Sequence, residues 1–326
     1  MTKYDIIGDI HGCAGELTTL LVQLGYRRDD AGVHRHPERT AVFVGDLVDR
    51  GPGQLEVLQT VKAMVDHGAA HIVMGNHEFN AICYATPHPL KPGDFLRTHE
   101  DPKNKSGHID FLEQLTDEQR EYYLEWFKTI PLWLDLGGIR VVHACWHDES
   151  MKVVQDATGS DRLTDLQHYI DASTKGHPLY EAVEILLKGP EIDLTGHQPY
   201  VDHIGKKRTS ARLRWWDADA RTLQQIADIR GMTTVDGEDY PPLPGIPVDE
   251  KYLGFVYTEE IPVIYGHYWF DWDSHQEDWT DYTACVDFSV AKDGKLVAYR
   301  WDGEPTITWR NYEPHTRDVV AETPSG

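Results

Sequence analysis

Three times within the first 84 residues, an apolar stretch of strand length is followed by a segment with helical spacing. The apolar stretches YDIIGD, TAVFVGD and AHIVMGN occupy residues 4–9, 40–46 and 70–76. Leucines then recur every three or four residues after the first stretch, and apolar residues do so again at 55–65. This alternation of strands and helices predicts a parallel sheet covered by helices, which is an α/β fold.

The remainder of the chain is less regular. Residues 85–108 are rich in proline, glycine and charge and are predicted to form a long loop, followed by a helix that Thr116 caps. Hairpins are predicted at Gly137–Gly138 and at Asp293–Gly294. Between them, helices at 162–172 and 178–188 precede the strand-like TSARLRWW. We therefore expect one domain over 1–326, with 146–260 as a large insertion between core strands.

Each of the first three strands ends in a polar signature. The signatures are GDIHG at 8–12, GDLVDRG at 45–51 and GNHE at 75–78. Parallel sheets bind ligands beyond the carboxyl ends of their strands, so these side chains are expected to converge on one edge. Two later strand-like stretches end in His143 and His267. Other histidines, His108 among them, lack such a context and are expected on the surface or in loops.

The converging residue types are suited to divalent metal ions. Carboxylate, imidazole and amide ligands together favour ions of the Mn, Fe, Zn or Co kind over calcium. A central carboxylate could bridge two ions about 3.5–4 Å apart, which is the arrangement that hydrolyses phosphate esters. The guanidinium of Arg50 supplies a fork for phosphate oxygens. Taken singly, the glycine–aspartate turns could be capping features, but three in order favour a metal site.

In this order and spacing, GDIHG, GDLVDRG and GNHE, with the distant histidines, resemble the calcineurin-like metallophosphoesterases. The DRG sequence, and GHYW at 266–269, are similar to the phosphoprotein-phosphatase branch. Within it, the opening YDIIGDIHGC resembles small bacterial protein phosphatases and diadenosine tetraphosphate hydrolases. The resemblance implies an α/β/β/α sandwich. It also implies two divalent ions, with Mn first and Fe, Zn, Co or Ni as alternatives.

The resemblance further implies a role for each matched residue. Metal ligands would be Asp9, His11, Asp46, Asn76, His143 and His267, with Asp46 bridging the two ions. Arg50 would bind the phosphate, and His77, paired with Asp49, would protonate the leaving oxygen. A metal-bridging hydroxide would attack in line. One departure is Ala144–Cys145–Trp146, where related protein phosphatases carry glycines after the histidine.

A second cationic group for the phosphate is expected from the later part of the chain. Candidates are Arg214, Arg212 and Lys188. The alternative is that these residues form salt bridges within an acidic protein while Trp215 and Trp216 form core.

Composition limits the partners. With 54 acidic and 31 basic residues and a formal net charge of −23, binding to a nucleic-acid polymer or an anionic membrane is not expected. Four scattered cysteines indicate no disulfide framework, and the N-terminus has no secretory apolar segment, so a cytoplasmic protein is expected.

The function expected first is hydrolysis of phosphate monoesters, on phosphoproteins or small aryl phosphates. The alternative is a dinucleoside polyphosphate hydrolase of the Ap4A type. A remote alternative, from a different class, is an inactive phosphoesterase-fold binding protein.

Overall fold

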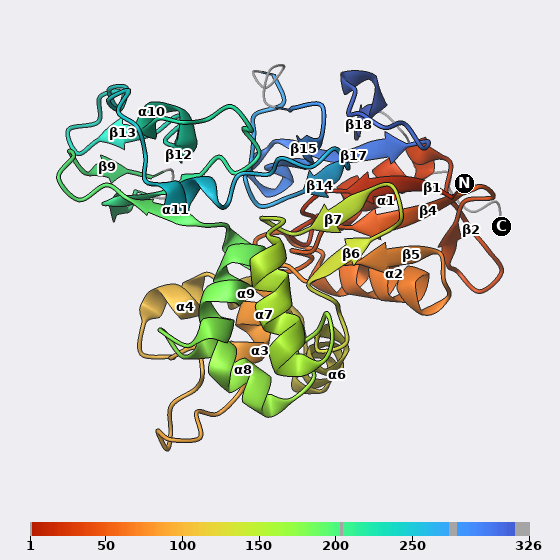
Figure 1. Cartoon of the computed structure of the whole chain (residues 1–326). Coiled ribbons are helices and arrows are strands. Elements are labelled where there is room, and N and C mark those ends of the chain that lie inside the picture. The colour runs from red at the N-terminus through yellow and green to blue at the C-terminus, as the bar shows by residue number, and fades with distance from the viewer. Residues whose placement is uncertain (1, 203–204, 274–278, 317–326) are drawn as a thin grey trace. The chain divides into compact units, whose positions relative to one another are not determined.

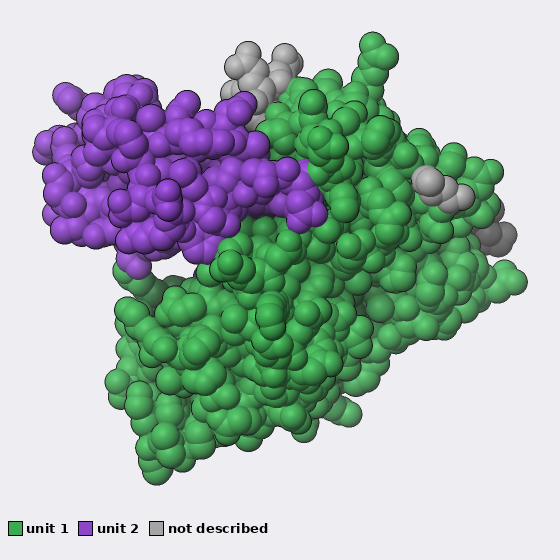
Figure 2. Space-filling view, in the orientation of Figure 1, with its two compact units in different colours: residues 1–187, 260–326 green, residues 188–259 purple. Residues whose placement is uncertain are grey.

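The computed structural model describes residues 2–202, 205–273 and 279–316. The chain divides into two compact units, coloured separately in Figure 2. Unit 1 comprises residues 1–187 and 260–326, and unit 2 comprises residues 188–259. Among the described residues, no helix has both the length and the apolar character needed to cross a bilayer.

The first sheet of unit 1 is mixed, with strand order β16-β17-β1-β4-β5 and β18 paired with β17 (Figure 1). Its strands are β1 (Lys3–Ile7), β4 (Arg39–Phe43), β5 (Ala70–Ile72), β16 (Asp287–Phe288), β17 (Lys295–Trp301) and β18 (Tyr312–Pro314). β1, β4 and β5 are parallel neighbours, as the alternating pattern predicts. β17 runs antiparallel to β1. The carboxyl ends of the three parallel strands therefore lie at one edge.

The second sheet of unit 1 has the order β15-β14-β7-β6. Its strands are β6 (Trp133–Asp135), β7 (Arg140–Val142), β14 (Val263–Tyr265) and β15 (Thr283–Cys285). β6 and β7 form the predicted hairpin, and β14 pairs with β7 in parallel. His143 and His267 follow two parallel neighbours and thus leave this sheet at the same edge. Unit 1 also contains a small antiparallel ribbon of β2 (Arg27–Arg28) and β3 (His34–Arg35).

Nine helices of unit 1 lie within the described residues. They are α1 (Ala14–Leu24), α2 (Gln54–Asp66), α3 (Asn76–Ala85), α4 (Pro102–Ser106), α5 (Ile109–Gln114), α6 (Asp117–Phe127), α7 (Asp148–Thr158), α8 (Leu166–Ser173) and α9 (Pro178–Lys188). α1 and α2 pack on the first sheet and on each other, and α3 packs on α6. Two 3₁₀ turns, η1 (Val290–Lys292) and η2 (Trp309–Asn311), flank β17. Thr116 caps α6 as predicted, because its side chain accepts a hydrogen bond from the amide of Gln119.

Unit 2 consists of short elements around a small core of its own. Its strands are β8 (Glu191–Asp193), β9 (Tyr200–Val201), β10 (Lys207–Arg208), β11 (Ser210–Leu213), β12 (Ala227–Asp228) and β13 (Thr233–Thr234), and its helices are α10 (Leu223–Ile226) and α11 (Glu250–Leu253). Two three-stranded sheets form, with orders β12-β11-β8 and β10-β9-β13. Leu194, Leu213 and Ile226 are buried in this core.

Several elements differ from the sequence-based expectations. The segment 85–108 contains the short helix α4, and α7 was not expected at all. The smaller compact unit spans 188–259, and α7, α8 and α9 up to Leu187 belong to unit 1. The single-domain description with an insertion over 146–260 stays a prediction.

Candidate metal centre

Five of the expected site residues have left-handed backbone conformations on the turns that follow the strands. Positive φ angles occur at His11 (47°), Asp46 (51°), Asp49 (70°), Arg50 (74°) and His267 (64°). Such conformations are unfavourable for residues with a Cβ and persist only where the surroundings hold them. Strain at these positions is typical of a functional site.

Glycines allow the turns to approach one another closely. Gly45 has φ 96°, and a Cβ there would lie 2.4 Å from the amide nitrogen of Gly75. A Cβ on Gly75 would in turn lie 2.3 Å from both the amide nitrogen and Oδ1 of Asp46. The GD and GN pairs therefore require glycine because the backbones after β4 and β5 touch.

Asp46 lies at the centre of the cluster. Its Oδ2 is 3.6 Å from His11 Nε2 and 3.8 Å from His77 Nε2, and its Oδ1 is 3.5 Å from His143 Nε2. Two sets of ligand atoms share this carboxylate, namely His11–Asp46–His77 and Asp46–His143–His267, and each set lies within 4.8 Å. Shared membership in both sets is the geometry expected of a bridging ligand.

Backbone carbonyls orient the imidazoles toward this centre. His11 Nδ1 lies 2.9 Å from the carbonyl of Val48, and His143 Nδ1 lies 2.7 Å from that of Val44. With an ion bound, a proton on each Nδ1 would leave the lone pair of Nε2 free to ligate the ion. His11 Nε2 is buried and makes no hydrogen bond among the described residues. An orphaned buried nitrogen with this orientation fits a metal ligand.

Asp9 and Asn76 line the same centre. Asp9 accepts long hydrogen bonds of 3.2 and 3.3 Å from the amide of His267, and Asn76 Oδ1 lies 3.2 Å from His143 Nε2. Burial raises the pKa of Asp9 well above its usual range, and the neighbouring carboxylates of Asp287 and Asp46 add to this. A cation would offset that repulsion, so the donor set fits divalent ions. The six ligand assignments remain proposals.

Asp46 itself is held in its charged form. Burial alone would raise the pKa of this carboxyl group. Interactions with His143, His77 and His11 outweigh burial and hold the pKa well below its ordinary value. The carboxylate is thus available to cations at neutral pH.

His77, Asp49 and Arg50 lie together beside this cluster. His77 Nδ1 is 2.5 Å from Asp49 Oδ2, and His77 Nε2 is 3.4 Å from Arg50 Nη2. Burial would raise the pKa of Asp49, but hydrogen bonds from His108 and His77 lower it to about 2. Burial would lower the pKa of His77, but the carboxylates of Asp46 and Asp49 raise it. A charged imidazole next to a guanidinium is suited to proton donation at a bound phosphate.

Two residues of this site were missed from the sequence. His108 was expected on the surface or in a loop, but it is buried, and its Nδ1 donates to Asp49 Oδ1 at 2.9 Å. Glu78 is fully buried, and its carboxylate accepts hydrogen bonds from the amides of Asp46 (2.9 Å), Leu47 (2.8 Å) and Gly75 (3.0 Å). The GNHE motif contains Glu78, but its partners become visible only in the fold.

The three candidates for a second phosphate-binding cation belong to unit 2. Lys188 ends α9, Arg212 pairs in register with Asp228, and the amide of Arg214 donates to the carbonyl of Ile226 at 2.7 Å. Trp215 and Trp216 are buried, which favours the core interpretation for these two residues. A role of the three cations in phosphate binding stays a prediction.

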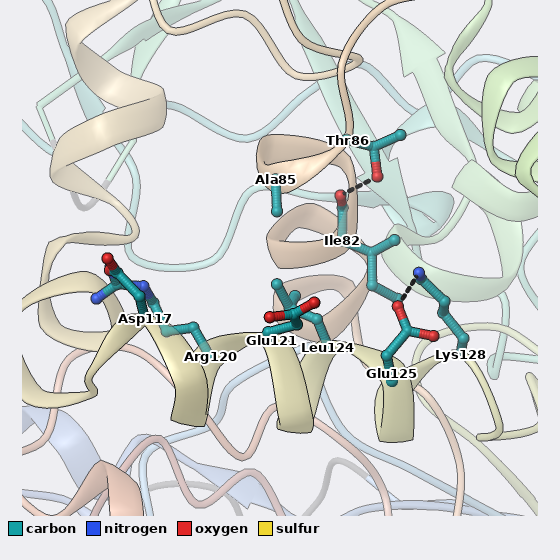
Figure 3. Close-up of a pocket in the computed structure, with 9 residues that line it drawn as sticks. All are labelled: Ile82, Ala85, Thr86, Asp117, Arg120, Glu121, Leu124, Glu125 and Lys128. Carbon is teal, nitrogen blue, oxygen red and sulfur yellow. Dashed lines mark hydrogen bonds and ion pairs between the residues drawn. The ribbon is translucent and has the colours of Figure 1, made fainter.

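A separate pocket of ≈ 320 Å³ lies between α3 and α6 (Figure 3). Its lining includes Thr86, whose hydroxyl donates to the carbonyl of Ile82, and the ion pair between Lys128 and Glu125. None of the expected metal or phosphate ligands lines it.

Residues 2–231 match the calcineurin-like phosphoesterase family. The chain belongs to this family. Its mixed α/β fold is the metallophosphoesterase fold, and a family of this kind implies divalent metal ions and a hydrolase.

Two curated relatives of this phosphoesterase are bis(5'-nucleosyl)-tetraphosphatases PrpE. The protein from Bacillus subtilis is 37% identical over 148 residues, covering 43% of this chain and 57% of the relative. The protein from Bacillus velezensis is 32% identical over 177 residues, covering 54% of this chain and 67% of the relative. The chain thus matches little more than half of the first relative's length.

Among solved structures, a protein serine/threonine phosphatase from Saccharomyces cerevisiae is 15% identical, with a TM-score of 0.45, over 99% of this chain and 82% of that one. The family assignment rests on the sequence match rather than on this likeness.

Proposed function

We propose that this phosphoesterase hydrolyses phosphate monoesters, on phosphoproteins or small aryl phosphates. The observation that carries the proposal is the adjacency of the Asp49–His77 pair and Arg50 to the Asp46-centred cluster. Divalent ions, with Mn²⁺ proposed first, would supply charge for the phosphate oxygens and an activated water.

Each protein group has a separate task in this reaction. Arg50 would bind and orient the phosphate through its guanidinium fork. His77 would pass its Nε2 proton to the leaving oxygen, while Asp49 keeps the imidazole charged and correctly turned. A proton donor matters most where the leaving group is a poor one, such as a serine alkoxide. The pairing of His77 with Asp49 is therefore suited to a monoester substrate with a poor leaving group.

A second candidate is hydrolysis of a dinucleoside polyphosphate. It is supported by the similarity to the two bis(5'-nucleosyl)-tetraphosphatases, which is restricted to about half of this chain. The leaving group would then be a nucleotide phosphate, which leaves readily without a proton.

The two candidates are separated by comparing kcat/KM, with Mn²⁺ added, for three substrates. These are diadenosine tetraphosphate, a phosphotyrosine peptide and a phosphothreonine peptide. A large advantage for either peptide supports the monoesterase. An advantage for the dinucleotide supports the second candidate. Metal binding without turnover of any of the three would favour the inactive binding protein.

The role of His77 is tested by His77→Asn. We expect the variant to keep its metal content and to lose about 10²-fold in kcat on an alkyl phosphate, with a smaller loss on 4-nitrophenyl phosphate. Metal content is measured by elemental analysis, and His88→Asn serves as the matched control. If His77→Asn hydrolysed alkyl phosphates with the kcat of the wild type, the assignment of His77 as the acid would be contradicted.

A further inference from the structure

Helix α5 and the residue before it contact the turn that carries Asp49 and Arg50 at several points. His108 Nδ1 donates to Asp49 Oδ1 (2.9 Å), and the amide of Arg50 donates to Asp110 Oδ2 (3.1 Å). Gln114 Nε2 donates to the carbonyl of Gly51 at 3.0 Å. Polar side chains along one short helix thus bind consecutive residues of one turn.

This turn needs external support. Asp49 and Arg50 are consecutive residues with φ angles of 70° and 74°. Two left-handed residues with side chains in succession are each unfavourable by about 1–3 kcal/mol, so contacts from outside the turn must hold them. Gln54 gives part of this support, since its side chain accepts from the amide of Asp49 and donates to the carbonyl of Gly51, both at 2.8 Å.

Asp49 is held on both carboxylate oxygens. Oδ2 binds His77 Nδ1, and Oδ1 binds His108 Nδ1. With His77 as its only side-chain partner, the carboxylate could rotate about its Cβ–Cγ bond and carry the His77 ring with it. A second bond to the other oxygen fixes the plane of the carboxylate.

His108 is itself fixed in place. It is only 4% exposed. Its ring stacks on Phe111, with centroids 4.8 Å apart, and meets the ring of Tyr84 edge-on at 5.5 Å. The donor to Asp49 therefore sits on a rigid aromatic support, as an effective positioning group must.

We propose that His108 is a positioning residue, which fixes Asp49 so that His77 presents its proton to the leaving oxygen. The inference rests on the proposed function, in which His77 is the proton donor. His108 touches neither the phosphate nor the metal ligands in this account, and acts through Asp49 alone.

The test compares His108→Ala and His108→Asn with wild type on two substrates. Asparagine places an N–H close to the position of Nδ1 and therefore keeps the donor. The substrates are 4-nitrophenyl phosphate, whose leaving group needs little protonation, and a phosphoserine peptide, whose alkoxide needs much. His88→Ala is the matched control, because His88 is a histidine of the same segment whose Nδ1 accepts from the amide of Leu90.

We expect His108→Ala to lower kcat on the phosphoserine peptide at least about tenfold. KM should stay within about twofold, and 4-nitrophenyl phosphate should be affected much less. His108→Asn should recover most of the loss, and His88→Ala should match wild type. Metal content and the circular dichroism spectrum are measured for every variant, and the Asn variant carries the test if the Ala variant does not fold.

Three results would overturn the inference. The first is wild-type kcat for His108→Ala on the phosphoserine peptide. This would show that His108 does not contribute to the reaction. The second is an equal loss on both substrates, and the third is no recovery in His108→Asn. Either of these two would indicate that His108 acts through packing alone. In each of these three cases, the proposed function still stands if the wild-type protein hydrolyses both substrates. Absence of wild-type turnover on both would instead remove the proposed function and the inference with it.

Discussion

Replacing Glu78 by glutamine is predicted to weaken the support of the metal centre while leaving every expected ligand in place. In the fold, Oε2 of Glu78 accepts from the amides of Asp46 and Gly75, and Oε1 accepts from the amide of Leu47. Glutamine has one acceptor oxygen. If that oxygen keeps the first two bonds, the amide NH₂ faces the N–H of Leu47.

The expected loss of stability follows from the number of hydrogen bonds that glutamine can keep. One hydrogen bond is lost and a buried N–H is left without an acceptor, at a cost of about 1–3 kcal/mol. The two remaining bonds also lose their ionised acceptor, which makes them weaker. We expect a destabilisation of about 2–4 kcal/mol in total. Glu78→Ala, which removes all three bonds, should cost more.

The assay is urea unfolding in the presence of EDTA, so that metal binding does not add to stability. It is combined with amide hydrogen exchange in peptides covering 45–48 and 74–76. Glu121→Gln, at an exposed position on α6, is the control. If Glu78→Gln unfolds within about 0.5 kcal/mol of wild type with unchanged exchange protection, the carboxylate does not support these turns.

Two further predictions concern stability away from the metal centre. Asp5→Asn should destabilise unit 1 by about 3 kcal/mol, because Asp5 is fully buried and accepts from Arg39 Nε at 2.8 Å. Urea midpoints are compared with those of Asp30→Asn, a change at an exposed aspartate of unit 1, and equal midpoints would refute the prediction. His34 should make the free energy of unfolding decrease as the pH is lowered. Burial and Arg28 lower its pKa from 6.5 to about 4, so its contribution is complete above pH 6.5 and is lost as pH falls toward 4. The change amounts to about 2–3 kcal/mol, and unfolding of His34→Gln should be correspondingly less pH-dependent between pH 7 and 4; parallel curves would contradict this.

The core of unit 1 could be predicted from sequence because its signals are local. Each of the first three strands lies in a mostly apolar stretch, and the polar residues that follow each stretch are expected at the sheet edge. This places Asp9, Asp46 and Asn76 without knowledge of any long-range contact. His143 and His267 were predicted on the same principle, and both leave neighbouring parallel strands.

The contact between His108 and Asp49 could not be predicted in this way. It joins residues 59 positions apart, and α5 has six residues, too few for a clear helical period. For a similar reason, the sequence of unit 2 gave no clear signal of a separate core. Its strands are two to four residues long, and its core forms only when Leu194, Leu213 and Ile226 come together.

Asp46 is proposed to organise a two-metal hydrolytic centre. The most direct measurement is titration of chelator-treated protein with Mn²⁺, following bound metal and 4-nitrophenyl phosphate hydrolysis together, for wild type and Asp46→Asn. We predict that wild-type turnover reaches its maximum at two bound ions per chain. Asp46→Asn should lose both high-affinity binding and turnover. Full turnover by Asp46→Asn, or by wild type without metal, would contradict the account.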